Sequence, residues 1–353
     1  MLRRELASAA LLLALSGCAA IPWPQTPRTP FPNRSPAGWL DLRGVVHVHT
    51  RGSHDSPGTI EEVVAAARSA GVSWVAITEH TRPGELGAWG VIDGVTVIPG
   101  FEMSSAGASL LAIGVAERPP VSKDPELLVR WVHAAGGVAF VGHFEHSRLA
   151  DPEAYRRAAP DGVELVNLHA AALERSASLG WRVPFLPTTF ALRSLLYLSP
   201  ENLANWERLP GSPPIVGSVD AHAKFRLLGR LGGTVDRYRD MFRLLTTHVL
   251  VRDTGAPAIL EALRAGRSYL AFEGFAPVDA FRFEPVAGAF ALAAPRPARL
   301  ALVCDGVRAA EADGPAAVLS APAGASRCRG EAWLGARMWI LTGYRDVVPR
   351  RSP

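Results

Sequence analysis

The chain has 353 residues, of which 48% are hydrophobic and 20% are charged, a balance typical of a soluble globular protein. Its formal net charge is +4, and lysine occupies only two of the 37 basic positions. No basic run interleaved with aromatic residues occurs in the sequence, so we expect no nucleic-acid partner.

The first 18 residues predict a secretion signal rather than a part of the fold. Arg3 and Arg4 precede an apolar stretch over residues 6–15 that is too short to span a bilayer comfortably. The sequence Leu-Ser-Gly-Cys that follows resembles the bacterial lipoprotein signal, which implies export, cleavage before Cys18 and a lipid anchor on its sulfur. Ala19 after the cysteine implies the periplasmic side of the outer membrane, whereas a plain secretory signal with an unmodified cysteine is the alternative. Residues 19–38 are so rich in proline that we expect an extended tether without helix or ladder.

From residue 39 onward, apolar runs that predict strands alternate with helical patterns. Each run ends at or shortly before a histidine or a carboxylate, and the six runs are 44–49, 73–78, 95–98, 138–142, 162–167 and 215–219. Helix starts are expected at Thr59, Asp124, Ser199 and Ala256, and the first has the capping-box pattern with Glu62. Because strands alternate with helices, we expect a parallel sheet closed as a β/α barrel over residues 39–274, with the carboxyl ends of all strands on one rim.

After about Gly274 the pattern changes to short apolar runs, at 300–304, 316–319 and 338–342, separated by glycine, proline and aspartate turns. We therefore expect a small β-sandwich domain over residues 275–353. This region holds Cys304 and Cys328, which would either form a disulfide in an oxidising compartment or remain two separate buried thiols. The spacing of the two cysteines does not decide between these alternatives.

The side chains at the strand ends indicate a metal site. His47 and His49 lie two residues apart in a strand, so we expect them on one side, with Val46 and Val48 on the other. Six further groups are expected at the same rim: Asp55, His80, Glu102, His143, Asp220 and His222. Burying so many ionisable groups together is costly unless cations lie among them. Nitrogen and carboxylate ligands without cysteine suit zinc, manganese or iron, and their number indicates two or three divalent ions.

In their order along the chain, these residues resemble the motifs of the polymerase and histidinol phosphatase (PHP) superfamily of metal-dependent phosphoesterases. The similarity covers residues 44 to about 274 and runs through HVHTRGSHDS, ITEH, PGFEMS, VGHFEH and GSVDAH. The resemblance implies a distorted, seven-stranded TIM-like barrel. It also implies an attached C-terminal β-domain, as in some secreted relatives.

The resemblance implies roles for individual residues as well. Four of them would hold the inner, catalytic metals: His47, His49, Glu102 and Asp220. Four more would complete the ligand set: Asp55, His80, His143 and His222. Either Asn167 or His169 would serve as a further ligand. The motif GHFEH departs from the usual His-Pro at this point, and we interpret His146 as a surface residue.

The chemistry implied is hydrolysis of phosphate mono- or diesters by a hydroxide that divalent metals activate. A phosphate also needs cationic partners, for which the candidates are Arg51, Arg82, Lys224 and Arg226. An ester, carbamate or amide hydrolase using the same metals is the alternative, although no lysine lies at a strand end as the related amidohydrolase pattern requires. A non-catalytic, metal-binding surface lipoprotein is a further interpretation.

Other histidines and a serine are interpreted as structural. Ser53, His54 and Asp55 are adjacent in sequence, and no G-x-S-x-G motif occurs, so we expect no Ser-His-Asp triad. His133 and His248 lie in helix-like and strand-like patterns, where we expect them to pack without a catalytic role.

Overall fold

The computed structural model describes residues 33–34, 38–80, 89–171, 193–194, 196–224, 234 and 236–348. The signal segment with Cys18, Arg82 and Arg226 lie outside the described residues, as does most of the tether. Within these ranges, no helix has the length and apolar character needed to cross a membrane. The tether does contain a short strand, β1 (Asn33–Arg34), which pairs antiparallel with β2 (Leu40–Val48). The expectation that residues 19–38 lack any ladder is therefore wrong at these two positions, which are not prolines and can donate backbone N–H groups.

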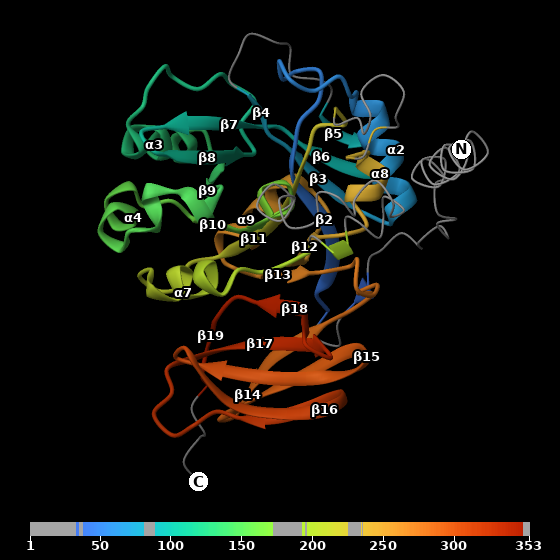
Figure 1. Ribbon diagram of the computed structural model, residues 1–353, viewed down its shortest axis with the longest axis vertical. Helices are drawn as coiled ribbons and strands as arrows, with labels where there is room; N and C mark the ends of the chain where they lie inside the picture. The colour runs from blue at the N-terminus through green and yellow to red at the C-terminus, as the bar shows by residue number, and fades with distance from the viewer. Residues whose placement is uncertain are drawn as a thin grey trace, which may run out of the picture.

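The described chain is an α/β protein built on one large mixed sheet (Figure 1). Each of the six predicted runs corresponds to a strand. These strands are β2, β3 (Trp74–Ile77), β6 (Val95–Ile98), β9 (Val138–Gly142), β10 (Gly162–Asn167) and β11 (Ile215–Ala221). The short strand β4 (Glu79–His80) directly continues β3, and β7 (Gly100–Ser105) continues β6. Strand β2 pairs in parallel with β3 and β11, β3 with β6, β4 with β7, and β10 with β9 and β11. Strand β8 (Ala108–Ile113) joins β7 to β9, so the pairings lead from β2 around the sheet and back to β2.

The sheet is not strictly parallel, which corrects the expectation from the sequence. Strand β8 runs antiparallel to β7 and β9 because β7 and β8 form a hairpin, with Gly107 at φ 74° in its turn and no helix in between. Strand β12 (Thr246–Val251) is antiparallel to both β2 and β13 (Ser268–Ala271). The short strand β5 (Gly90–Ile92) is antiparallel to β6. The mixed sheet therefore departs from a regular alternation of parallel strands and helices.

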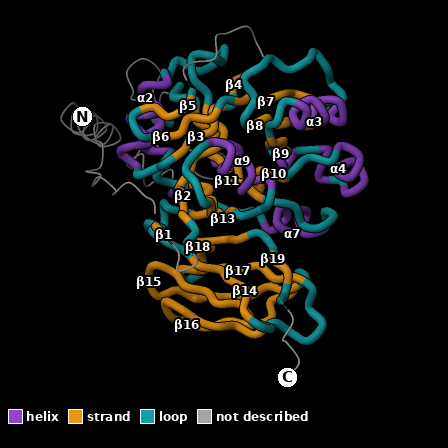
Figure 2. The backbone as a smooth tube through the Cα atoms, turned by 180° about the vertical axis from the view of Figure 1, so that it is seen from behind, coloured by secondary structure: helices purple, strands orange, loops and turns teal. Residues whose placement is uncertain are grey.

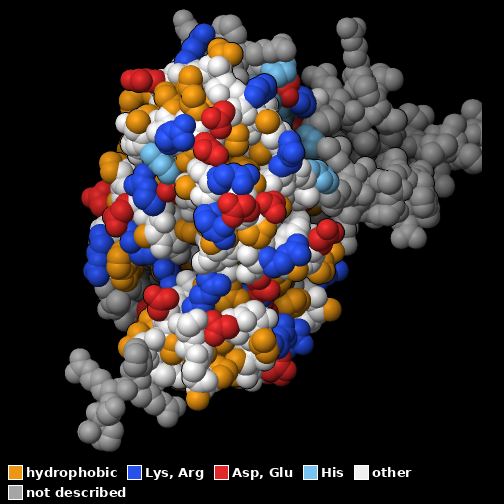
Figure 3. All heavy atoms as spheres, turned by 90° about the vertical axis from the view of Figure 1, so that its left-hand side faces the viewer, with side chains coloured by type: hydrophobic (Ala, Val, Ile, Leu, Met, Phe, Trp, Pro, Cys, Tyr) orange, Lys and Arg blue, Asp and Glu red, His pale blue; other side chains and the backbone are white. Residues whose placement is uncertain are grey.

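The four predicted helix starts are confirmed. Thr59 and Glu62 form a reciprocal capping box at α2 (Ile60–Ala70), and Gly71 ends that helix at φ 67°. The helices α3 (Pro125–Ala134) and α7 (Pro200–Arg208) begin with Asp124 and Ser199 as side-chain caps. Further helical elements of the described residues are α4 (Pro152–Ala158), α8 (Tyr238–Met241), α9 (Ala256–Arg264) and the 3-10 turns η1 (Phe144–His146) and η2 (Arg148–Ala150). Basic and acidic side chains intermingle on the face that α3, α4 and α7 form (Figure 3), as the ion pairs of Arg157 with Glu126 and Glu153 illustrate.

The C-terminal part continues the same hydrogen-bonded sheet, because β13 pairs with β18 (Arg337–Thr342). The other strands of this part are β14 (Arg282–Val286), β15 (Ala289–Cys304), β16 (Val307–Ser320), β17 (Arg327–Leu334) and β19 (Arg345–Asp346), all antiparallel. They lie below the main body in Figure 1 and keep that place in the reverse view of Figure 2. Their apolar side chains form a separate buried cluster around Phe290, Leu300 and Trp339.

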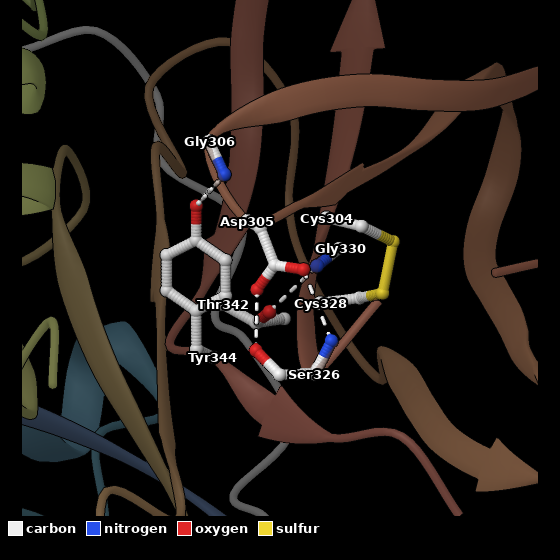
Figure 4. Close-up of a disulfide and its surroundings, with 8 residues drawn as sticks. All are labelled: Cys304, Asp305, Gly306, Ser326, Cys328, Gly330, Thr342 and Tyr344. Carbon is white, nitrogen blue, oxygen red and sulfur yellow. Dashed lines mark hydrogen bonds between the residues drawn. A yellow bond between two sulfur atoms is a disulfide. The ribbon is translucent and has the colours of Figure 1, made fainter. Parts of the chain in front are cut away.

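Cys304 and Cys328 form a disulfide, which resolves the alternative left open by the sequence (Figure 4). The two residues are direct partners across β15 and β17, with their Cα atoms 4.0 Å apart. Next to the bond, Asp305 accepts hydrogen bonds from the Ser326 backbone N–H and hydroxyl, at 3.0 and 2.6 Å. The bond therefore closes the loop between β15 and β17 that includes β16.

Candidate metal centre

The structure gathers all nine predicted ligand residues in one place. Strand β2 supplies His47 and the adjoining His49, while β4, β7 and β11 supply His80, Glu102 and Asp220. His143, His169 and His222 directly follow or closely follow strands, and Asp55 lies in the loop before α2. Their ligand atoms fall into four overlapping groups within 4.8 Å of one another: His47 with Glu102 and His143; His47 with His49 and Asp220; His49 with Asp55, His80 and His222; and His169 with Asp220 and His222.

Glu102 lies at the centre of these groups. Its Oε2 atom is 3.4 Å from His47 Nε2, 3.5 Å from His49 Nε2 and 3.2 Å from His80 Nδ1. Its Oε1 atom is 3.4 Å from His143 Nε2. One carboxylate thus faces four imidazoles, an arrangement that lets it bridge two cations.

Asp220 is the second carboxylate shared between groups. Its Oδ1 atom is 3.5 Å from His47 Nε2, 3.4 Å from His49 Nε2 and 3.5 Å from His222 Nδ1. Its Oδ2 atom is 3.6 Å from His143 Nε2 and 3.8 Å from His169 Nδ1. Asp220 therefore contacts residues of all four groups, and Asp55 completes the outer one.

Asp55 joins the outer histidines to a lysine. Its Oδ1 atom is 3.5 Å from His80 Nε2, and its Oδ2 atom is 3.2 Å from His222 Nε2. Lys224 Nζ donates to the same Oδ2 atom at 2.6 Å. Of the candidate substrate contacts, Lys224 thus reaches the ligand set. The side chain of Arg51 is exposed and contacts none of the nine ligand residues.

The structure distinguishes between Asn167 and His169, the two alternatives for the further metal ligand. The side-chain oxygen of Asn167 accepts a hydrogen bond from the Ala170 backbone at 2.9 Å, and its Nδ2 atom faces Asp220 Oδ2 at 3.3 Å. An amide nitrogen cannot coordinate a cation, so Asn167 supports Asp220 instead. His169 is the residue of the two that offers a ligand atom to the site.

Three ligand residues have a left-handed backbone, which places their side chains. His47, His143 and Asp220 have φ values of 63°, 46° and 47°, and the pairings of β2 with β3 and β11 shift register around His47 and Asp220. Non-glycine residues adopt this conformation at a cost and concentrate at functional sites. The shift also changes the alternation of β2: Val46 and Val48 pack in different apolar clusters, so their expected placement on one side is wrong.

A further layer of residues, not identified from the sequence, orients the histidines. Glu164 is fully buried, and its Oε1 atom is 2.6 Å from His47 Nδ1. Ser53 Oγ donates to Glu79 and lies 3.1 Å from His49 Nδ1, so it accepts from that ring. Both rings then direct Nε2 toward the site. The signal for Glu164 was present, since it is a carboxylate inside the apolar run 162–167. The role of Ser53 as a partner of Glu79 also leaves no place for it in a hydrolase triad.

The centre contains buried polar atoms that find no hydrogen-bond partner in the described part of the chain. They are His47 Nε2, His49 Nε2, Asp55 Oδ1 and Asp220 Oδ1. Buried groups of this kind are rare because each one loses its bonds to water without replacement. All four face the space between the ligand residues, where divalent cations would satisfy them. The donor set therefore fits a metal centre.

The pKa values describe a balance of charges within the centre. Burial alone would lower the pKa of His47, but Asp220, Glu164 and Glu102 raise it well above the ordinary value. Burial would raise the pKa of Asp220, but His47 and His49 hold it well below the usual range. Burial and the neighbouring His49 lower the pKa of His222 to about 4. A cation that binds here would thus displace a proton from His47 and leave the carboxylates charged.

The remaining histidines take different places. His146 and His54 are exposed, as expected for residues outside the ligand set. His133 pairs with Asp161 at 2.9 Å near the surface, and His248 is buried against Asp41 at 2.8 Å, away from the ligand groups.

No protein-family model matches the chain, and no curated protein matches it. Solved structures that are similar to it include the following two. One is a two-domain protein from Bacteroides vulgatus ATCC 8482 that contains a predicted PHP-like metal-dependent phosphoesterase, with 16% identity, a TM-score of 0.44, and 90% of this chain and 99% of that chain covered. The other is a proposed metal-dependent phosphoesterase from Bifidobacterium adolescentis ATCC 15703, with 15% identity, a TM-score of 0.31, and 55% of this chain and 93% of that chain covered.

Proposed function

We propose that the chain is a metal-dependent hydrolase of phosphate mono- or diesters with two or three divalent ions, which would be zinc, manganese or iron. The observation that carries the proposal is the convergence of six imidazoles on Glu102 and Asp220, with buried ligand atoms that lack other partners in the described residues. Such a set is hard to explain without cations, because like-charged and unpaired buried groups are costly. The motif order of the PHP superfamily supports the same proposal.

The residues of the chain would divide the work as follows. Glu102 and Asp220 would hold the ions, while Glu164 and Ser53 orient His47 and His49 with Nε2 toward the ion site. Bound divalent ions would supply Lewis acidity and lower the pKa of a water molecule to about 7. The Lys224 ammonium, which is about one-third exposed beside Asp55, would contact the phosphate anion.

The proposal extends to the setting of the site. We propose that the ring of strands around β2 and β11 corresponds to a distorted barrel of the PHP type and that residues 275–353 form an attached β-domain. We also propose that the protein is exported and anchored to the membrane by lipid on Cys18. The lipoprotein signal supports this localisation, and the disulfide is in keeping with an oxidising compartment.

The test uses the chain from residue 19 onward, so that β1 is kept, purified without chelator. Elemental analysis should find two or more divalent ions per chain, and the protein should hydrolyse phenyl phosphate or bis(p-nitrophenyl) phosphate. His80→Ala and Asp220→Ala should lower kcat/KM by at least about 100-fold, since each removes a ligand, while Glu117→Gln, an exposed residue, should have no effect. Hydrolysis of carboxyl esters alone, or full turnover by both ligand variants, would refute the proposal.

A further inference from the structure

Glu145 is a buried carboxylate that the metal centre described above does not use. It lies in η1, two residues after His143, and its side chain is only 8% exposed. Both of its oxygen atoms are buried, and neither has a hydrogen-bond partner in the described ranges of the chain. Burial of a carboxylate without hydrogen bonds costs several kcal/mol in general, so its presence here requires a reason.

Glu145 faces the ring of His143. Glu145 Oε1 is 3.5 Å from His143 Nδ1, while the other ring nitrogen, Nε2, faces Glu102 at 3.4 Å and Asp220 at 3.6 Å. The left-handed backbone of His143 turns the chain so that Glu145 comes back beside the ring. The imidazole therefore lies between a buried carboxylate on one side and the ligand cluster on the other.

The same arrangement occurs at His47. There Glu164 Oε1 lies 2.6 Å from His47 Nδ1, and His47 Nε2 faces Glu102 and Asp220. A carboxylate on the far nitrogen of a metal-bound histidine fixes its tautomer and makes the near nitrogen a better ligand. At His143 the competing group is Asn167 Nδ2, at 3.4 Å, but that amide lies closer to Glu164 and Asp220, at 3.2 and 3.3 Å. An amide N–H is a donor, so of these two groups Glu145 is the one that can accept from Nδ1–H.

We propose that Glu145 is a positioning residue that accepts the Nδ1 proton of His143 and holds Nε2 toward the metal centre. This inference rests on the proposed metal site. At 3.5 Å the hydrogen bond is not fully formed, and a cation at Nε2 would strengthen Nδ1–H as a donor and draw the two groups together. Glu145 then raises the affinity of the protein for metal.

Two variants of similar volume test the inference. Glu145→Gln keeps one carbonyl acceptor, and Glu145→Met keeps none. Metal affinity should fall in the order wild type, Gln, Met, by about 10-fold to 100-fold for Met, the usual effect of losing such a partner.

The experiment titrates chelator-treated protein with Co²⁺ and Zn²⁺ by calorimetry and records the visible absorption of the Co²⁺ complex. Wild type and Glu117→Gln are the reference and the exposed control. Unchanged stoichiometry with weaker binding and an altered Co²⁺ spectrum would support a positioning role. Wild-type affinity in both Glu145 variants would overturn it, and so would the loss of one whole ion, which would make Glu145 a direct ligand. A wild-type chain that binds no metal would instead overturn the metal centre itself, and the role of Glu145 with it.

Discussion

Glu164 provides the sharpest test of how the centre is held together, because both of its oxygens are already used. Oε1 contacts His47 Nδ1 at 2.6 Å, and Oε2 accepts from the His143 backbone N–H at 2.6 Å and from Asn167 Nδ2 at 3.2 Å. Burial alone would raise the pKa of Glu164, but His47 holds it below the ordinary value, so the group is ionised at neutral pH. Glu164 therefore differs from Glu145 in partners, although both are buried acids near the same rings.

Glu164→Gln should destabilise the metal-free protein by about 2–4 kcal/mol. The substitution replaces one acceptor by an NH₂ group, which must face a donor at either His47 or His143. Glu164 then loses its hydrogen bond to one of these two residues, which lowers the free energy of unfolding by about 1.5–3 kcal/mol. Its hydrogen bond to the other residue becomes a bond between neutral groups, which lowers the free energy of unfolding by about 1 kcal/mol more. The buried donor that loses its partner adds to this loss.

Urea unfolding of chelator-treated protein, followed by tryptophan fluorescence, measures this difference. Glu117→Gln should change the free energy of unfolding by less than about 0.5 kcal/mol, as is usual for surface substitutions. If Glu164→Gln costs less than about 0.5 kcal/mol, the partners seen in the structure do not govern stability and the reasoning fails.

Two predictions concern stability away from the centre. Burial alone would lower the pKa of His248, but Asp41, 2.8 Å away, raises it above its ordinary value. The resulting stabilisation is complete below about pH 6.5 and is lost as the pH rises through the pKa of His248 in the folded protein. His248→Gln should therefore lower the free energy of unfolding in urea more at low pH than at high pH. An equal loss at both pH values would contradict the ion pair of His248 with Asp41. Reduction of the Cys304–Cys328 bond, which joins residues 24 apart, should lower the free energy of unfolding by about 3 kcal/mol, and unfolding that is unaffected by reductant would contradict this.

Features set by local sequence were predictable. The capping box of Thr59 and Glu62 depends on residues three apart, and the structure has it as expected. The ligand residues could be identified because each follows a short apolar run, and the carboxyl ends of neighbouring parallel strands meet at one edge. Pattern and position were sufficient for these features, since neither depends on the detailed packing of distant parts.

Features set by tertiary contacts could not be predicted in the same way. The alternation in β2 changes at His47 because the backbone is left-handed there, a conformation that residue type does not favour and that only the surrounding pairings impose. The antiparallel course of β8 depends on a hairpin at Gly107 rather than on a helix, and the run 108–113 was not recognised as a strand. Glu145 gave no signal, because nothing in its neighbours along the chain indicates that it is buried.

The strained backbone and the unpaired atoms of the centre have one common consequence. His47, His143 and Asp220 each keep a left-handed conformation that costs on the order of 1–3 kcal/mol, and the buried nitrogens and oxygens around them lack partners in the described chain. Neither feature stabilises the fold by itself, yet both place ligand atoms toward the same space. Cations bound there would add about 4 kcal/mol of stability at a free concentration of 1,000 times Kd. Folding and metal binding should therefore be coupled. In the metal-free protein, the surrounding sheet and Glu164 should hold the ligand residues in the positions that metal binding requires.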